Sequence, residues 1–237
     1  MIEQLRISAK NLGEVALSSF CPRCFWIKIR LQNKLPFQIF PRIFSSIDSY
    51  SKQLVHSWFD RHKGAPVWLQ GLGPLSGYME PPHYTRFNII DEKYNILLTG
   101  SPDGVFVKPD KSHIIVDYKT SKYKGTHDGL YRMYEAQLNA YGMIGEQRGL
   151  APVSGLALVY TEPITDITAA SDDANHREDG FTMGFAAHVH EVKQDLGIVR
   201  PLLMTAREIY EMSESPPGRA ACKNCELLDQ LIGIAKA

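Results

Sequence analysis

All four cysteines of the chain lie in two C-x-x-C pairs near opposite ends of the sequence: Cys21 and Cys24 in FCPRCF, and Cys222 and Cys225 in ACKNCE. Two residues between cysteines let one turn of backbone present both thiolates to the same metal ion. Because the chain has no fifth cysteine, we predict one four-thiolate metal site rather than two separate redox pairs. The alternative is that each pair is a set of small buried residues and that the two pairs never meet.

A second group of reactive side chains contains Asp103 in TGSPDGVFV and Asp117 and Lys119 in HIIVDYKTS. Residues i and i+2 of a strand point to the same face, so Asp117 and Lys119 share one face, and Asp103 can approach them from a neighbouring hairpin strand. Two carboxylates offer the hard oxygen ligands that Mg or Mn prefers, while a lysine can orient a water molecule or stabilise developing charge. The alternative is an exposed charged pair at the end of a strand.

The order of the motifs resembles the RecB-like branch of the PD-(D/E)XK nuclease superfamily. The matching residues are Gly100 and Asp103 in GSPD, Asp117 and Lys119 in DYK, and Gln137 and Tyr141 in YEAQLNAYGMI. The stretch ISAKNLGEVALSSFCPRCF also looks like the opening helix of that branch, which runs into a Cys-Pro-Arg step. The resemblance extends from Ser8 to Cys225, so it covers most of the chain.

The resemblance implies a divalent-metal site with Mg or Mn as the cofactor. Asp103 and Asp117 would be metal ligands, together with the backbone carbonyl of Tyr118. Lys119 would be the catalytic lysine, which positions or helps deprotonate the attacking water and stabilises the transition state of phosphoryl transfer.

Further candidate residues lie on predicted helices and on a late strand. Gln137 and Tyr141 are four apart on one helical face and would contact the region of the active-site lysine or a substrate phosphate; the alternative is a surface amide and a core aromatic ring. His56, in KQLVHSWFD, is the candidate for the metal-binding histidine that this family often takes from an early helix. His188 and His190 could share a metal, but a half-exposed strand face is the favoured interpretation.

The resemblance also bears on the cysteines. Several relatives, including the CRISPR adaptation exonucleases and the nuclease domains of some helicase-nucleases, hold a 4Fe-4S cluster by cysteines that flank the nuclease core. Their usual division is one cysteine before the core and three after it, whereas this chain has two and two. Tetrahedral zinc therefore stays open as the alternative. The resemblance favours the cluster, with Cys21, Cys24, Cys222 and Cys225 as its ligands.

Strands and helices must position these residues. Ser8 is a suitable N-cap for a first helix. Residues 45–62 predict an amphipathic helix with one broad apolar face, which carries Ile47, Tyr50, Leu54, Trp58 and Phe59. Strands over residues 83–90, 95–100, 104–108 and 113–120 predict an antiparallel meander, which a helix over 128–148 connects to a crossover strand over 154–160. A strand over 181–192, a helix over 196–212 and a short terminal helix follow.

Together with the resemblance, this order predicts an α/β protein with a restriction-endonuclease-like central mixed sheet flanked by helices. No shift in composition divides the chain, so we predict a single nuclease domain over residues 1–237. Its terminal segments, residues 1–34 and 213–237, would be joined by the four-cysteine metal site.

The charge balance excludes a uniform polycation, because 26 Lys and Arg residues match 26 Asp and Glu residues. Locally, residues 1–34 are basic and residues 162–195 are acidic. The basic segment, with Phe25 and Trp26, could track a phosphate backbone; a solvated helix face is the alternative. The sequence has no apolar run long enough to span a membrane and no secretory h-region, so we expect a cytoplasmic protein without a membrane partner.

We therefore expect a Mg- or Mn-dependent nuclease that hydrolyses DNA phosphodiester bonds. The resemblance implies single-stranded DNA or DNA ends as the substrate, acting in repair, recombination or CRISPR adaptation with the partner proteins of such a complex. One alternative is a catalytically inactive nucleic-acid-binding module with a structural four-cysteine metal site. Another is a zinc-clamped adaptor in which DYK has no catalytic role. The sequence leaves the oligomeric state open.

Overall fold

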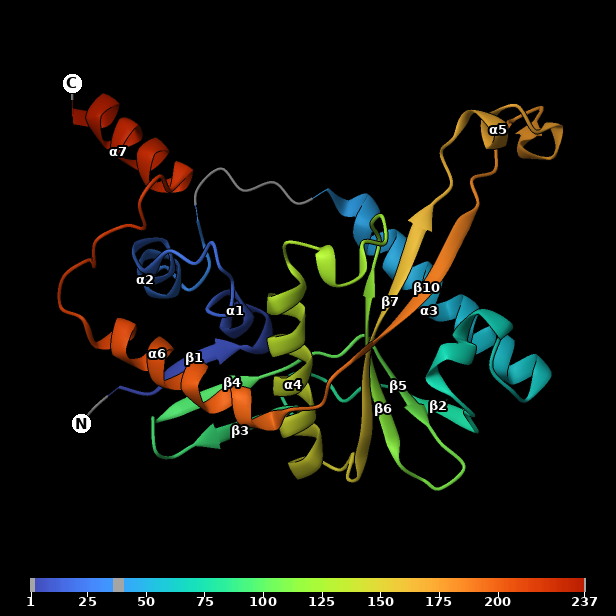
Figure 1. Cartoon of the computed structure of the whole chain (residues 1–237), viewed down its shortest axis with the longest axis horizontal. Coiled ribbons are helices and arrows are strands. Elements are labelled where there is room, and N and C mark those ends of the chain that lie inside the picture. The colour runs from blue at the N-terminus through green and yellow to red at the C-terminus, as the bar shows by residue number, and fades with distance from the viewer. Residues whose placement is uncertain (1–2, 36–40, 237) are drawn as a thin grey trace.

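The computed structural model describes residues 3–35 and 41–236, and most of its strands belong to two sheets (Figure 1). The larger sheet has the order β10-β7-β6-β5-β2, in which β6 and β7 are parallel and the other neighbours are antiparallel. Its strands are β2 (Gly77–Met79), β5 (Gly104–Val107), β6 (His113–Lys119), β7 (Val153–Pro163) and β10 (Phe185–Val192). This mixed sheet with its flanking helices confirms the predicted α/β class.

The smaller sheet contains β1 (Leu5–Ser8), β4 (Ile96–Thr99) and β3 (Asn88–Asp91), with β1 parallel and β3 antiparallel to β4. The prediction of one continuous meander is therefore wrong, because β4 and β5 lie in different sheets. The chain leaves β4 through a segment that contains Pro102, which has no backbone N–H for a ladder. The predicted strand pattern missed β1, which has only four residues and pairs with the other edge of β4.

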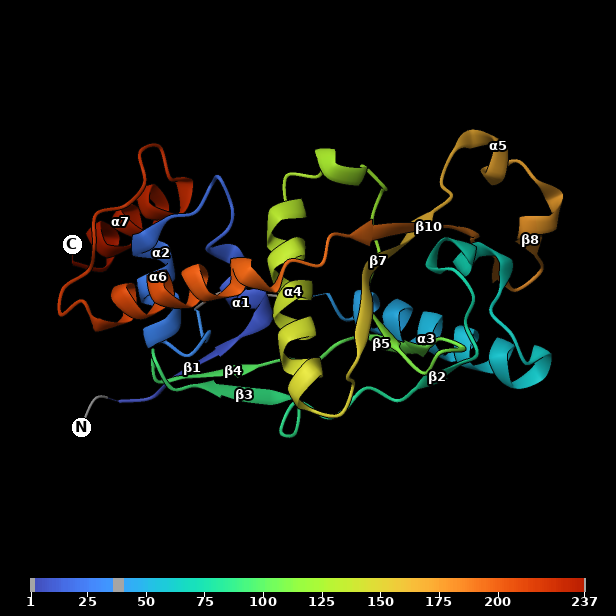
Figure 2. The same ribbon diagram turned by 60° about the horizontal axis from the view of Figure 1, so that its bottom comes forward.

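Helix α4 (Tyr131–Gln147) lies between the two sheets in both views of the molecule (Figures 1 and 2). Its buried residues Leu138 and Ile144 join a core that also contains Ile115 of β6. The next residue of β6, Val116, faces the opposite side and belongs to a second core with residues of α3 (Arg42–His62) and η1 (Val67–Leu72). The alternation of β6 thus assigns odd-numbered residues to the α4 side and even-numbered residues to the α3 side.

The two terminal regions lie side by side at one end of the molecule (Figures 1 and 2). At the opposite end of the molecule, β7 and β10 extend into an arm with a short helix and a two-stranded hairpin at its tip (Figure 1). These elements are α1 (Ala9–Glu14), α2 (Pro22–Arg30), η4 (Leu196–Ile198), α6 (Val199–Glu211) and α7 (Lys223–Lys236) in the terminal region, and α5 (Ile167–Ala170), η3 (Asp173–Asn175), β8 (His176–Arg177) and β9 (Gly180–Phe181) in the arm; η2 (Gly125–His127) precedes α4.

Two helix predictions have different outcomes. Ser8 is the N-cap of α1, and its hydroxyl accepts the backbone N–H of Asn11 at 3.2 Å, as predicted. Helix α3 is also present, but its predicted apolar face is largely exposed: Phe59 is 4 % exposed, whereas Tyr50 is 64 % exposed.

Of the helices in the described residues, none is long and apolar enough to cross a membrane. Residues 1, 2 and 237 of the predicted terminal segments lie outside the described residues.

Candidate active site

A cavity of about 460 Å³ opens where the ends of β4 and β6 approach α1, α3 and α4. Its walls combine carboxylates, lysines and amide or hydroxyl groups from segments far apart in the sequence. The residues that line it include Lys10, Asp48, Gly100, Ser101, Asp103, Asp117, Tyr118, Lys119, Gln137 and Tyr141. The structure therefore brings five predicted catalytic residues and the predicted backbone ligand to one cavity.

Asp117 and Lys119 are adjacent odd-numbered positions near the end of β6, so both project toward α4. Asp117 is only 3 % exposed, and its carboxylate forms an ion pair with the Lys119 ammonium. The Lys119 Nζ also lies 4.4 Å from the centre of the Tyr134 ring on α4. The lysine is thus held between a carboxylate and an aromatic face, at the boundary between the core and solvent.

Gln137 and Tyr141 contact the aspartate and the GSPD segment. The Gln137 side-chain amide donates to Asp117 Oδ1 at 2.9 Å and to the Tyr141 hydroxyl at 2.9 Å. The Tyr141 hydroxyl in turn donates to the backbone carbonyl of Ser101 at 3.1 Å. Both side chains are 4 % exposed. They therefore position Asp117 relative to the segment that carries Asp103.

Asp103 reaches the end of β6 through its carboxylate. Its Oδ2 accepts the N–H of Tyr118 at 3.0 Å, and its Oδ1 accepts the ammonium of Lys52 at 2.8 Å. The first contact fixes the carboxylate beside the Asp117–Tyr118 peptide. The second neutralises it with a cation from α3.

Helix α3 approaches the cavity through Asp48 and Lys52, which the sequence analysis did not select. The Asp48 carboxylate accepts the hydroxyl of Thr120 at 3.0 Å and lines the cavity. An acid and a base at positions i and i+4 of a helix share one face, and this spacing is the signal that could have identified them.

The structure does not bring His56 to this cavity. Its ring stacks on Tyr78, with 3.9 Å between the ring centres, and its Nδ1 lies 3.3 Å from Glu80. His56 is two turns beyond Asp48 on α3, so it lies over β2 rather than at the end of β6. Among the described residues of α3, Asp48 rather than His56 lines the cavity.

Burial dominates the electrostatics of Asp117. Loss of solvent raises the pKa of its carboxyl group to about 6; the Lys119 charge lowers this value, and the Asp103 charge raises it. The same burial raises the pKa of the Tyr141 hydroxyl, so this group stays protonated and can donate to Ser101 at neutral pH.

Without divalent metal, the protein is therefore expected to lose stability through Asp117 as the pH rises. In the unfolded chain Asp117 ionises near 3.8, while in the folded chain it ionises with a pKa of about 6. The folded state binds more protons between these values, so ionisation costs up to about 3 kcal/mol of folding free energy by pH 7. Urea unfolding at pH 4.5 and pH 7 should show this as a stability difference that Asp117→Asn abolishes. Equal pH slopes for the two proteins would contradict the assignment.

The oxygen donors of this cavity fit a hard divalent cation. Asp103 and Asp117 supply carboxylates from two adjoining segments, and Asp48 lines the same cavity from α3. Within the described residues, the buried Gln137 Oε1 has no hydrogen-bond partner, so the site retains an unused polar atom beside Asp117. Mg or Mn prefers such oxygen ligands and usually keeps several waters. Lys52 and Lys119 pair with Asp103 and Asp117 and so balance part of the carboxylate charge.

Gly100 allows the GSPD segment to pass close to the core. A Cβ at this position would lie 2.8 Å from Phe87 Cδ1 and 2.9 Å from Tyr141 Cδ1. Gly100→Ala is therefore expected to displace the Tyr141 ring and destabilise the fold by about 1–3 kcal/mol. Denaturant unfolding checks the stability, and Gly129→Ala is a matched control because nothing lies within 4 Å of a Cβ there. Equal stability of the two variants would show that Gly100 is not needed for packing.

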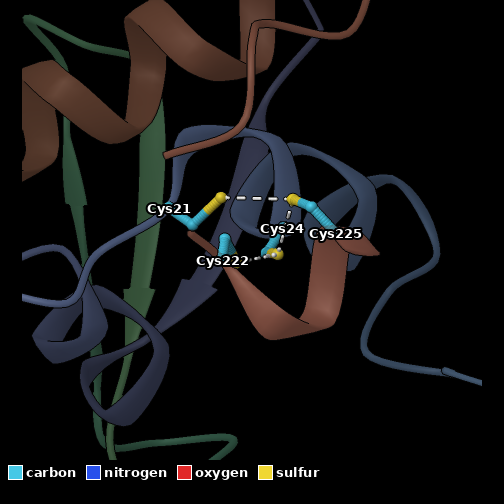
Figure 3. A group of neighbouring side chains, drawn as sticks. All are labelled: Cys21, Cys24, Cys222 and Cys225. Atoms are coloured by element: carbon cyan, nitrogen blue, oxygen red, sulfur yellow. Dashed lines mark hydrogen bonds between the residues drawn. The ribbon is translucent and has the colours of Figure 1, made fainter. Parts of the chain in front are cut away.

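The four cysteines form a second site, between α2 and the start of α7 (Figure 3). Their Sγ atoms all lie within 4.8 Å of one another. The separations include 3.5 Å for Cys21–Cys225, 3.6 Å for Cys24–Cys222 and 3.6 Å for Cys24–Cys225. The predicted meeting of the two C-x-x-C pairs is thus confirmed, and the group could hold a metal ion.

The surroundings of Cys21 favour its thiolate. Burial opposes ionisation, but the backbone N–H groups of Cys24 and Arg219, together with hydrogen bonds from the Cys225 and Cys24 side chains, outweigh it and lower the pKa of Cys21 to about 6. The Arg219 N–H lies 3.3 Å from the Cys21 sulfur. Gly218 also passes so close to the site that a Cβ there would lie 2.9 Å from the Cys225 sulfur. The returning C-terminal segment therefore helps to build the site with its backbone.

Two other sequence-based hypotheses gain an intramolecular explanation. Two basic side chains near the N-terminus have partners in the protein: Arg30 stacks on Trp26 at 4.3 Å, and Lys28 pairs with Glu14. His188 and His190 both contact Tyr123, by ring stacking and by a 3.0 Å hydrogen bond to the His190 Nδ1, respectively. These contacts support a structural role for both groups.

Among the comparisons with known proteins, a family model identifies the superfamily. A sequence model of the PD-(D/E)XK nuclease superfamily matches residues 46–229. No curated protein matches the chain. A solved structure titled "Crystal structure of SSO0001" has a TM-score of 0.41 and 13% sequence identity, with 91% of this chain and 80% of that chain covered.

Proposed function

The chain belongs to the PD-(D/E)XK nuclease superfamily, and we propose that it is a metal-dependent nuclease that hydrolyses phosphodiester bonds. The observation that carries the proposal is the convergence of Asp103, Asp117 and Lys119 on one cavity, with Gln137 holding the buried aspartate. This arrangement combines oxygen ligands for a divalent cation with an ammonium group that can act on a phosphate or a water.

Asp103, Asp117 and the Tyr118 carbonyl would hold Mg or Mn, with Asp48 as a further ligand. When bound, such a cation lowers the pKa of a water and offsets charge on the phosphate oxygens. Lys119 has two tasks at this site: it orients the attacking water and donates hydrogen bonds to the oxygens that gain charge in the transition state. Gln137 and Tyr141 keep the Asp117 carboxylate in place and do not themselves contact the reacting atoms.

We propose DNA as the substrate, either single-stranded or at its ends, and a role in repair, recombination or CRISPR adaptation in the cytoplasm with partner proteins. This part of the proposal is supported by the RecB-like order of the motifs. A catalytically inactive nucleic-acid-binding module is the second candidate. The complete set of Asp103, Asp117 and Lys119 favours the enzyme, because a site that has lost turnover commonly lacks one of these groups.

The decisive experiment incubates the purified protein and Mg or Mn with end-labelled and circular DNA, each single-stranded and duplex. Cleavage that requires the cation supports the enzyme, and cleavage of circles identifies an endonuclease mode. Binding without cleavage of any substrate would support the inactive module. RNA of the same sequence tests the preference for DNA.

Lys10 provides a separate test of phosphate binding. Its exposed side chain lines the cavity, and its charge acts on Asp117 from α1. Lys10→Ala is expected to raise KM about fivefold with kcat nearly unchanged, and to reduce the slope of log affinity against log salt by about one. Lys108→Ala, at the far end of the β5–β6 hairpin, is the control. An unchanged salt dependence would remove Lys10 from the substrate site.

We propose that the four cysteines hold one zinc ion and join the terminal segments of a single domain. Four thiolates around one tetrahedral zinc lie about 3.8 Å apart, given Zn–S distances near 2.3 Å. The sulfur separations of 3.5 and 3.6 Å support this arrangement. A 4Fe-4S cluster binds its cysteines through four separate irons, which requires wider spacing. A colourless protein with one zinc per chain supports zinc; a brown protein with iron and sulfide would establish the cluster.

A further inference from the structure

An apolar groove of about 350 Å³ runs beside the proposed active site, between α3 and the strands β7 and β10. Three aromatic rings contribute to it: Tyr50 from α3, Trp68 from η1 and Phe185 from β10. Aliphatic side chains and three hydroxyl groups complete the walls, and none of the described lining residues carries a charge. The remaining lining residues are Ser46, Ile47, Ser51, Leu54, Thr161 and Ala187.

The groove is open to solvent although its walls are apolar. Tyr50 is 64 % exposed and Phe185 is 37 % exposed. Helix α3 presents Ile47, Tyr50 and Leu54 at helical spacing, which explains why the sequence predicted an apolar face here. A face of this kind that stays open in the folded chain is suited to an external ligand.

The groove lies next to the active-site cavity, and a pair of threonines links their walls. Thr161 lines the groove, and its hydroxyl lies 3.4 Å from that of Thr120, which donates to Asp48 in the cavity. Thr120 follows Lys119 in the chain. Asp48 of α3 lines the cavity, while residues 47 and 51 of the same helix line the groove, so one helix forms a wall of both.

We propose that the groove binds unpaired nucleobases of the strand whose phosphodiester lies in the cavity; this inference rests on the proposed nuclease function. Aromatic rings stack on bases of any sequence, and the hydroxyls of Ser46, Ser51 and Thr161 can pair with base edges. A duplex keeps its bases paired and stacked, so only a single strand or an unwound end can place bases here. The exposed Lys122 and Lys124, in the turn after β6, supply cations for the connecting phosphates.

Binding measurements with a Lys119→Ala background separate recognition from cleavage. Fluorescence anisotropy would compare a labelled single-stranded oligonucleotide with a blunt duplex of the same sequence. Tyr50→Ala and Phe185→Ala are each expected to weaken single-strand binding roughly 5- to 100-fold, as for loss of a stacked base, and to leave duplex binding unchanged. Tyr50→Phe should retain the affinity. Phe181→Ala, which alters an 82 % exposed ring at the tip of the arm, is the matched control.

A single abasic site moved along the oligonucleotide tests the contact directly. When the abasic site falls at the position that the groove binds, the protein with Tyr50 should bind this strand more weakly than the intact strand. The Tyr50→Ala variant should bind the abasic strand as tightly as it binds the intact strand. Equal affinities of the parent and both groove variants, or equal Tyr50→Ala losses on intact and abasic strands, would overturn the proposal and assign the groove to another ligand. Cleavage by the Lys119-containing protein is measured in parallel. Cleavage that the groove substitutions do not affect, with unchanged binding, refutes only the groove proposal. Binding that depends on the groove, in a protein that cleaves nothing, refutes only the proposed nuclease function.

Discussion

Lys119→Ala is expected to lower the rate constant for phosphodiester hydrolysis by about 100- to 1,000-fold, the usual cost of removing one group that stabilises transition-state charge. The Lys119 ammonium is the cation held directly against Asp117, and it lies at the mouth of the buried site. Its loss removes hydrogen bonds to the phosphate oxygens and to the attacking water. Single-turnover cleavage at saturating Mg or Mn measures this step without product release.

The same substitution should also raise the pKa of Asp117 further, because the Lys119 charge lowers it in the parent protein. Part of the loss would then reflect weaker metal binding, which a higher pH restores. The catalytic part should persist at every pH. Lys108→Ala, on the far hairpin turn, controls for the loss of a positive charge. Cleavage by Lys119→Ala at the parental rate would eliminate this cavity as the active site.

Cys225→Ser is expected to release the bound metal and detach α7. Within the described part of α7, Cys225 is the buried residue; Leu227 and Ile234 are 56 % and 75 % exposed, so the helix has little core contact of its own. Arg23 and Asp229 also join α2 to α7, at 2.6 and 3.0 Å, but Asp229 is exposed and such pairs contribute about 1 kcal/mol or less. The thiolate site therefore holds the helix.

Loss of a structural metal site of this kind is expected to cost on the order of 3 kcal/mol, or roughly 6–12 °C in Tm for a chain of this size. Metal analysis, thermal unfolding and limited trypsin digestion at Arg219 and Lys223 measure the three consequences. Leu231→Ala, which changes an exposed α7 residue, is the control and should resist trypsin like the parent protein. Retention of metal with unchanged Tm would show that three thiolates suffice and that α7 is anchored elsewhere.

The sequence predicted the parts of the site that depend on local order. The two-residue period of β6 placed Asp117 and Lys119 on one face, and the helical spacing of Gln137 and Tyr141 placed these two on one face of a helix, which the resemblance assigned to the region of the lysine. The C-x-x-C spacing likewise identified the cysteine site, because both pairs must offer their sulfurs from a single turn. These patterns depend on residues close in the sequence, so they do not depend on how the strands are distributed between the sheets.

Long-range pairing was harder to predict. The split of the strands between two sheets depends on β1, a four-residue strand whose partner lies about 90 residues further along the chain. The position of Asp48 depends on how α3 crosses β6, which its periodicity does not specify. For the same reason the apolar face predicted for α3 does not specify which of its side chains are covered: the tertiary packing buries Val55 and Phe59 and leaves Tyr50 open.

The cysteine site also affects the chain before it is folded. Cys24 and Cys222 are 198 residues apart, so an ion that stays bound to both pairs closes most of the chain into a loop. Such closure restricts the unfolded ensemble by about 5 kcal/mol in chain-entropy models. A chain that begins refolding with the ion bound therefore has its two terminal segments already joined. Its sheets then form within a closed loop rather than in a linear chain.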